Sequence, residues 1–293
     1  MANGFQEKQK AAAERNQSLL CVGLDPDPSL MPIADVLEFN KVIIDATKDL
    51  VCAFKPNVAF YDVLGEQGYA TLRKTIECIP SHIPIIGDSK RGDVQPSSKF
   101  YAKTMFEALG FDAVTVNSFG GRDALQPFLD YRDKGVFVWC RSSNPGAGEL
   151  QDLLVSPPNG TGLDGDEDRR PLYEWIAIRA SEWNDEGNIG LVVGATYPEE
   201  LKRVRDLCRD MPILIPGVGA QQGPLELAVS HGVDEFGRNA IINASRGVIY
   251  ASNSPGDFEQ AARKRAGEVR DFINQELVFQ NQGWPTPAPV SMS

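Results

Sequence analysis

Eight short apolar runs recur along this chain of 293 residues, and segments with helical periodicity lie between them. The runs are almost continuously apolar, which is typical of parallel strands buried on both faces. Regular alternation of such strands with helices indicates βαβ units that share one parallel sheet. The predicted strands are 19–25, 51–55, 84–90, 113–117, 136–140, 189–193, 213–216 and 240–244.

Eight strands alternating with helices over about 250 residues match a (β/α)8 TIM barrel, an α/β fold whose site lies at the carboxyl ends of the strands. A doubly wound open sheet is the alternative. Gly217-Val218-Gly219 lacks the third glycine and the following acid of a dinucleotide fingerprint, so we favour the barrel. The clearest predicted helices are 70–78, 97–109, 123–131, 172–183 and 198–208.

Two segments have a composition that does not fit the regular strands and helices of the predicted barrel. The connection 144–170 follows the fifth strand, contains three prolines and five glycines, and carries an acidic insertion at 163–170. It is too long for an ordinary βα loop, so we expect an active-site lid or an insertion. Near the other end the chain becomes rich in proline and amides. We therefore expect a single catalytic domain over 1–277 and a disordered tail over 278–293.

The net charge of −11 argues against a nucleic-acid or membrane partner, because both need a basic surface. A small anionic ligand is compatible with it, since it needs only a local positive pocket. Five scattered cysteines without a CxxC pair, and two histidines, do not support a metal site. Residues 1–16 lack the apolar core of a signal peptide, and no apolar run is long enough to span a membrane. We expect a cytoplasmic protein.

The segment Gly87-Asp88-Ser89-Lys90-Arg91-Gly92-Asp93 carries the strongest indication of chemistry. Because side chains alternate along a strand, Asp88 and Lys90 should project to the same side. Asp93 follows just beyond the strand end. An acid, a base and a second acid would then converge at the rim of the sheet. A solvated loop is the structural alternative, and the other strand ends help to decide between the two.

Charged residues also end the first two predicted strands, at Asp25 and Lys55. In a barrel, the carboxyl ends of all strands meet at one face. Asp25, Lys55, Asp88 and Lys90 would then surround the barrel mouth, where alternating charges hold one another ionised. This arrangement favours a functional site over chance surface charges.

The loops after the seventh and eighth strands predict a phosphate site, which is a recurrent feature of such barrels. Gly217 and Gly219 permit close approach of the backbone, and their amides can face an anion. Arg246 supplies a planar, permanently charged group for phosphate oxygens, and Gln221 can donate through its amide. The structural alternative is a plain turn beside a surface arginine.

Taken together, these segments resemble the orotidine 5′-phosphate decarboxylase family in its longer bacterial form. The resemblance runs in family order from Cys21 to Ala251, which is most of the chain. GDSKRGD and PGVGAQ are its most specific parts. The matching segments are CVGLDPDP, AFKPNVAFYD, GDSKRGD, DAVTVNSFGGRDALQPF, CRSSNPGAGELQDL, IPGVGAQQG and NASRGVIYA.

The resemblance implies a cofactor-independent, metal-independent enzyme that converts orotidine 5′-phosphate to UMP in pyrimidine biosynthesis. Lys90 would donate the proton to carbon 6 of the pyrimidine, and Asp88 would lie beside the substrate carboxylate. Lys55 would belong to the same charged array. Asp93 would reach into the neighbouring subunit's site, so that the active unit is a homodimer with shared sites.

The resemblance also implies which residues hold the substrate. Asp25 and Lys55 would hold the ribose hydroxyls, and Ser143 would contact the pyrimidine edge. Gln221 and Arg246 would bind the 5′-phosphate.

The chain departs from the family pattern in several places, two of which lie at the GDSKRGD segment and directly after it. Ser89 stands where alanine is common. The segment 94–97 stands where the family often has a glycine and then a threonine that crosses the dimer interface, a role that Ser97 would take here.

Two other functions compete with decarboxylation. One is another phosphosugar enzyme of the same barrel superfamily, such as a 3-keto-hexulose-phosphate synthase, whose relatives usually use Mg²⁺. The other is a non-catalytic nucleotide-phosphate sensor, which would be expected to lose Lys90 or Asp93. Both residues are present, and no added metal-binding acid is apparent.

Overall fold

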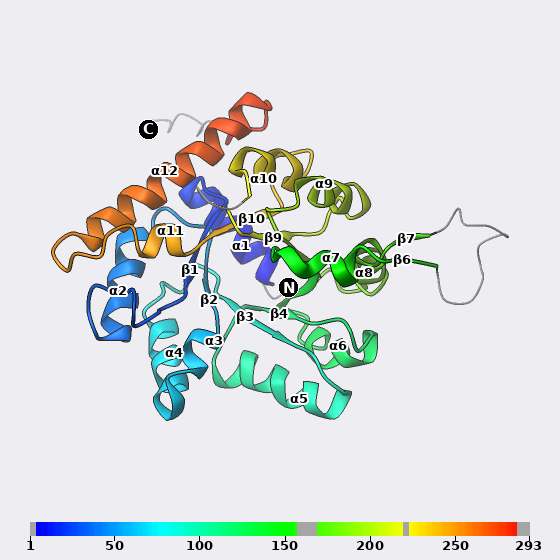
Figure 1. Ribbon diagram of the computed structural model, residues 1–293, viewed down its shortest axis with the longest axis horizontal. Helices are drawn as coiled ribbons and strands as arrows, with labels where there is room; N and C mark the ends of the chain where they lie inside the picture. Colours follow the sequence, from blue (N-terminus) through cyan, green and yellow to red (C-terminus); the bar gives the residue numbers. More distant parts are fainter. Residues whose placement is uncertain (1–3, 157–168, 219–222, 286–293) are drawn as a thin grey trace, which may run out of the picture.

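A ring of parallel strands forms the centre of the computed structural model, which describes residues 4–156, 169–218 and 223–285 (Figure 1). Each predicted strand is present within two residues of its expected bounds. The eight strands of the ring are β1 (Leu20–Leu24), β2 (Ala53–Pro56), β3 (Ile86–Arg91), β4 (Ala113–Val116), β5 (Gly135–Arg141), β8 (Ile189–Val193), β9 (Ile213–Pro216) and β10 (Ala240–Ala244).

The strand order confirms the barrel and excludes the doubly wound sheet. The strands follow the order β2-β1-β10-β9-β8-β5-β4-β3, and every neighbouring pair in this order is parallel. Parallel bridges between Phe54 and Ile85 and between Asn57 and Asp88 join β2 to β3 and close the ring. All carboxyl ends therefore open on the same face.

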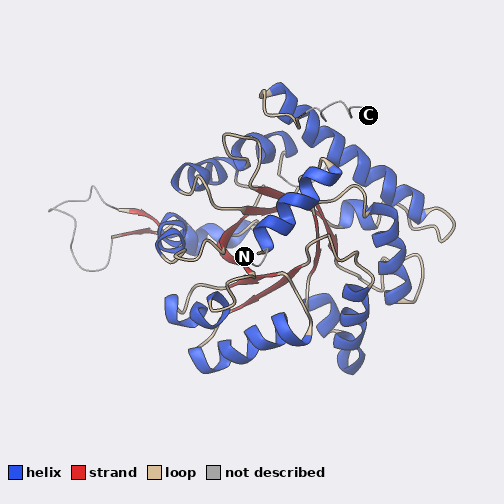
Figure 2. Ribbon diagram, turned by 180° about the vertical axis from the view of Figure 1, so that it is seen from behind, coloured by secondary structure: helices blue, strands red, loops and turns tan. Residues whose placement is uncertain are grey.

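Helices surround the ring, as Figure 2 shows from behind. The five predicted helices are all present, but 97–109 divides into α5 and a π-helical turn at Thr104–Ala108. Short 3-10 turns occupy Gly65–Gln67 and Pro145–Ala147. The helices are α1 (Phe5–Asn16), α2 (Val36–Thr47), α3 (Ala59–Asp62), α4 (Gly68–Glu77), α5 (Gln95–Lys103), α6 (Arg122–Leu129), α7 (Gly148–Gln151), α8 (Leu172–Glu182), α9 (Pro198–Leu207), α10 (Leu225–Gly232), α11 (Arg246–Ile249) and α12 (Phe258–Phe279).

The barrel interior is filled from its amino-terminal end by α1, a helix that the sequence analysis did not predict. The ring of Phe5 packs edge-on against Phe137 at 5.6 Å between centroids. It joins an inner cluster that includes Ile86, Leu214 and Ile241 from three different strands. A larger cluster lies between the strands and the surrounding helices. The closed amino end leaves the carboxyl end as the place for a site.

The long connection after β5 is partly structured. It begins with the 3-10 turn at Pro145–Ala147 and α7, and continues into β6 (Leu154–Val155), which pairs antiparallel with β7 (Arg170–Pro171). This hairpin base was not predicted, because each strand has only two residues. Most of the acidic insertion lies within 157–168, outside the described residues.

The predicted tail boundary at 277 is too early. Helix α12 continues to Phe279, and the Arg238 guanidinium carbon lies 3.7 Å from the Trp284 ring centroid. The Trp284 indole nitrogen donates to Asn274 Oδ1 at 2.8 Å. The proline and amide residues of this segment predicted disorder. The prediction overlooked Trp284, whose ring has packing partners in the barrel. Residues 286–293 lie outside the described part of the chain. Within that part, no helix is long and apolar enough to cross a bilayer.

Candidate active site

A cavity of about 680 Å³ opens at the carboxyl ends of the strands. Its lining includes residues that lie on or directly after β1, β2, β3, β5, β9 and β10, so the ring brings together side chains that are far apart in the sequence. The predicted site residues that line it are Asp25, Lys55, Asp88, Lys90, Ser143, Gly217 and Arg246.

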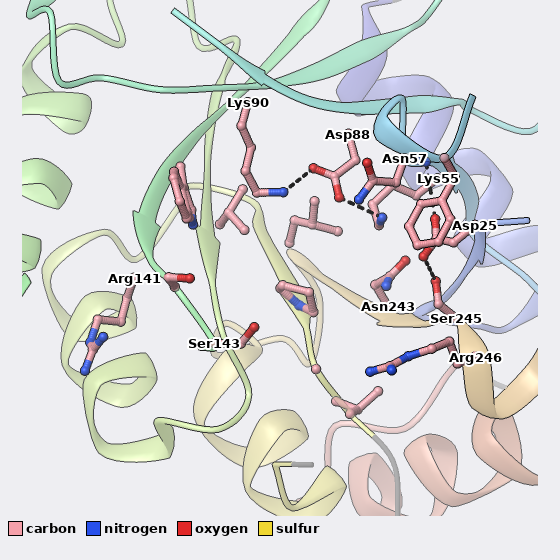
Figure 3. A pocket seen from close by; sticks show the side chains of 18 of the residues that line it. Asp25, Lys55, Asn57, Asp88, Lys90, Arg141, Ser143, Asn243, Ser245 and Arg246 are labelled. Carbon is pink, nitrogen blue, oxygen red and sulfur yellow. Dashed lines mark hydrogen bonds and ion pairs between the residues drawn. The ribbon is translucent and has the colours of Figure 1, made fainter. Parts of the chain in front are cut away.

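Three charged side chains form a continuous row on one wall of this cavity (Figure 3). Lys55 Nζ lies 2.9 Å from Asp88 Oδ2, and Lys90 Nζ lies 2.6 Å from Asp88 Oδ1. Lys55 is 2% exposed and Asp88 is 8% exposed, whereas a third of the Lys90 side chain reaches solvent. The row therefore presents one accessible ammonium group, held in place by a buried ion pair.

The row keeps its buried members charged. Burial alone would raise the pKa of Asp88, but the ammonium groups of Lys55 and Lys90 hold that pKa well below its usual range. Burial would likewise lower the pKa of Lys55, yet the carboxylates of Asp88 and Asp25 raise it above the ordinary value. Charges that would be costly if isolated are thus stabilised by one another.

Asp25 is fixed by contacts from two neighbouring strand ends. Its Oδ1 accepts from the backbone N–H of Asn57 at 3.2 Å, and its Oδ2 accepts a short hydrogen bond from Ser245 Oγ. Gly23 makes the second contact possible, because a Cβ at that position would lie 1.7 Å from Ser245 Oγ. The carboxylate therefore has a defined orientation at the cavity edge.

Arg246 marks the opposite end of the cavity from Lys90 (Figure 3). It begins α11, directly after β10, and lines the cavity with Gly217 from the loop after β9. Among the described residues, none forms a hydrogen bond or ion pair with its guanidinium. Gly217 has φ +91°, a conformation that favours glycine. Gly219 and Gln221 lie outside the described residues.

The remaining wall comes from β5 and the loop after it. Ser143 lines the cavity, and its carbonyl accepts from Thr196 Oγ1 at 2.9 Å. Beneath it the fully buried Arg141 guanidinium donates to Gln151 at 3.1 Å and stacks on the Tyr197 ring at 3.8 Å. Arg141 therefore ties the loop that carries Ser143 to the neighbouring helices.

Several lining residues were not predicted. Trp139 lies within an apolar strand, and nothing in the sequence separated it from the core; Lys90 Nζ is 5.8 Å from its ring centroid. Asn243 is buried, and its Oδ1 has no hydrogen-bond partner in the described part of the chain. As the single polar residue of the run 240–244, it could have been identified as facing a site. Ser245 precedes Arg246 and was given no role.

Two predicted residues do not line the cavity of a single chain. Asp93 is exposed, and its Oδ1 accepts from the backbone N–H of Val94 at 2.6 Å. Ser97 is half-buried in the first turns of α5. Neither is among the described residues around the cavity.

Comparison with known proteins gives one consistent result. Residues 18–262 match the family described as "Orotidine 5'-phosphate decarboxylase / HUMPS family". The orotidine 5′-phosphate decarboxylase of Thermomicrobium roseum is 48% identical over 278 residues, covering 92% of this chain and 95% of that protein. That of Dehalococcoides mccartyi is 48% identical over 271 residues, with 92% and 97% covered. The solved OMP decarboxylase of Leishmania donovani has a TM-score of 0.79 and 38% identity, covering 93% of this chain and 98% of that one.

Proposed function

Because this chain belongs to the orotidine 5′-phosphate decarboxylase family, its reaction is the conversion of orotidine 5′-phosphate to UMP and CO₂, and we propose that Lys55, Asp88 and Lys90 carry it out without a cofactor. The observation that supports this most is the buried Lys55–Asp88 pair beside the accessible Lys90 ammonium. In the described part of the chain, no group of three or more His, Cys, Asp or Glu side chains is placed to hold a metal ion.

The substrate lies across the cavity with its phosphate at Arg246 and its pyrimidine at Lys90. The guanidinium of Arg246, which has no partner among the described residues, binds the phosphate with the loop that follows β9, where Gly217, Gly219 and Gln221 provide further donors. Asp25 and Lys55 hold the ribose hydroxyls between these two ends.

Ser143 contacts the edge of the pyrimidine from the opposite wall. This orientation places the substrate carboxylate beside Asp88. The carboxylate is attached to carbon 6, so the same orientation brings that carbon to Lys90.

The reaction breaks the bond between carbon 6 and the carboxylate, and the electron pair stays on carbon 6 as CO₂ leaves. The Lys90 ammonium stabilises the developing negative charge and then transfers a proton to that carbon. Solvent then reprotonates the Lys90 amine. It can do so because a third of the Lys90 side chain is exposed. Asp88, held ionised, repels the substrate carboxylate and holds the Lys90 ammonium in place.

We further propose a homodimer in which Asp93 completes the partner's site. Asp93 lies beyond the end of β3 and does not line its own cavity. Three exposed apolar side chains come from its surroundings: Val94, Phe100 on α5, and Phe119 in the loop after β4, which are 65%, 72% and 92% exposed. Exposed apolar side chains next to Asp93 are consistent with a two-fold interface between subunits that would bury these side chains. Ser97, near the start of α5, would lie at the same interface.

We also propose a cytoplasmic location. All five cysteines lie in the described ranges and are unpaired, and four of them are buried. Unpaired cysteines are typical of a reducing compartment.

The proposed function is tested by adding orotidine 5′-phosphate to the purified protein after exhaustive treatment with a chelator. The expected result is loss of the orotate absorbance with formation of UMP, at the same rate as without the chelator. Activity that falls and returns with Mg²⁺ would contradict the proposed metal-independent mechanism and favour the related phosphosugar enzymes.

A further inference from the structure

Strand β3 is irregular at the point where it carries Asp88 and Lys90. Its register against β4 pairs Gly87 with Val114 and Arg91 with Val116. The three residues 88–90 therefore lie opposite the single residue Thr115. A bulge of this kind leaves backbone groups without partners in the ladder.

The hydroxyl of Thr115 replaces the missing ladder bonds. Its Oγ1 accepts from the backbone N–H groups of Ser89 and Lys90, each at 3.0 Å, and donates to Asp88 Oδ1 at 2.9 Å. A hydroxyl offers one donor and two acceptor sites, so all of its capacity is used. Thr115 is fully buried and lies behind the cavity wall, not in the lining.

The backbone of Lys90 needs such support. Its φ is +45°, in the left-handed region that is strained for a residue with a side chain. Strained residues persist where the surrounding contacts hold them, and they concentrate at functional sites. Here the backbone N–H groups of the two consecutive residues Ser89 and Lys90 both donate to one side-chain oxygen.

We propose that Thr115 is a positioning residue whose hydroxyl fixes both the bulged backbone at Lys90 and the orientation of the Asp88 carboxylate. One oxygen thereby sets the relative placement of the acid and the base, which meet at 2.6 Å. This inference rests on the proposed roles of Asp88 and Lys90. Thr115 acts through them and does not touch the substrate.

A set of substitutions separates this role from simple core packing. Thr115→Val keeps the branched shape and removes the hydroxyl, Thr115→Ala removes both, and Thr115→Ser keeps the hydroxyl. Ser89→Ala is the matched control, because the Ser89 hydroxyl only donates to the Thr115 carbonyl at 3.2 Å. For each variant, kcat, KM and the affinity for UMP are measured.

The expected result is a fall in kcat of about 10²-fold for both Thr115→Val and Thr115→Ala, the size that follows from slight misplacement of catalytic groups. UMP affinity should stay within about threefold, because the phosphate, ribose and pyrimidine-edge contacts are unchanged. Thr115→Ser and Ser89→Ala should stay close to the parent in kcat.

Two results would overturn the inference: a parental kcat in Thr115→Val, or an equal loss in Thr115→Ser, which would show that the hydroxyl is not the cause. The Lys90→Ala variant separates this failure from failure of the proposed mechanism. Inactive Lys90→Ala with normal Thr115→Val refutes only the positioning role. Active Lys90→Ala refutes the role of Lys90 itself.

Discussion

Lys55 and Asp88 form an almost fully buried ion pair, with 2.9 Å between Nζ and Oδ2, on the wall of the cavity. Removing one partner of such a pair leaves the other charge buried without compensation, which costs about 3–5 kcal/mol. We therefore expect Asp88→Asn to lower the free energy of unfolding by about this amount, measured by denaturant titration.

Lys90→Ala is the matched control for that measurement. It removes the other lysine that contacts Asp88 but leaves the buried pair intact, and the Lys90 side chain is a third exposed. Its cost should stay near 1 kcal/mol or below. An Asp88→Asn protein as stable as the parent would show that the pair does not stabilise the fold.

The stability that Asp88 provides should depend on pH in one direction. Its pKa in the folded chain is held below the unfolded value of about 3.9, so the unfolded chain takes up the proton first as pH falls. The contribution is complete above about pH 5 and declines as pH falls through about 4 toward the folded pKa. The difference in unfolding free energy between parent and Asp88→Asn should shrink over that range. A difference that grows on acidification would contradict the depressed pKa.

Arg246→Ala should weaken binding of UMP much more than binding of uridine. The guanidinium forms a charge-assisted contact only where a phosphate is present to accept it, and such a contact contributes about 1.5–3 kcal/mol. Calorimetric titration with both ligands measures the difference. An equal loss of affinity for the two ligands would place Arg246 outside the phosphate site.

Mixing two inactive variants tests the shared site. In a heterodimer of Lys90→Ala and Asp93→Ala chains, one site is complete, because it receives Lys90 from the Asp93→Ala chain and Asp93 from the Lys90→Ala chain. The second site carries both defects. Activity should approach one parental site per heterodimer, diluted by inactive homodimers. Subunits that exchange, as shown by tagged chains, yet stay inactive would show that Asp93 serves its own site.

The strands could be predicted because parallel barrel strands are buried on both faces, which makes them short and almost wholly apolar. The helix α1 could not, since its composition is polar and only one side is buried, through Phe5, Ala12 and Ala13. The start of the tail, predicted after residue 277, was placed too early for a related reason. Contacts of Trp284 with Arg238 and Asn274 hold a segment whose composition suggests disorder.

Some residues of the candidate site could likewise be predicted from the sequence, and others could not. A charge directly after an apolar run is conspicuous, so Asp25, Lys55 and Asp88 could be identified from the sequence. The convergence of Asp88 and Lys90 was expected from regular alternation, whereas β3 is bulged there. Thr115 lies inside an apolar run, and only the coordinates show what its hydroxyl contacts. Trp139 was hidden among core residues for the same reason.

The most direct test of the account is turnover and UMP binding by Lys90→Ala, beside Lys74→Ala as a control on the exposed surface of α4. We predict that Lys90→Ala loses measurable decarboxylation while UMP still binds, because Arg246 and Asp25, which we propose hold the phosphate and the ribose, lie elsewhere in the cavity. Lys74→Ala should match the parent in both. Turnover by Lys90→Ala within about tenfold of the parent, a difference of only about 1.4 kcal/mol in the barrier, would contradict its role as proton donor.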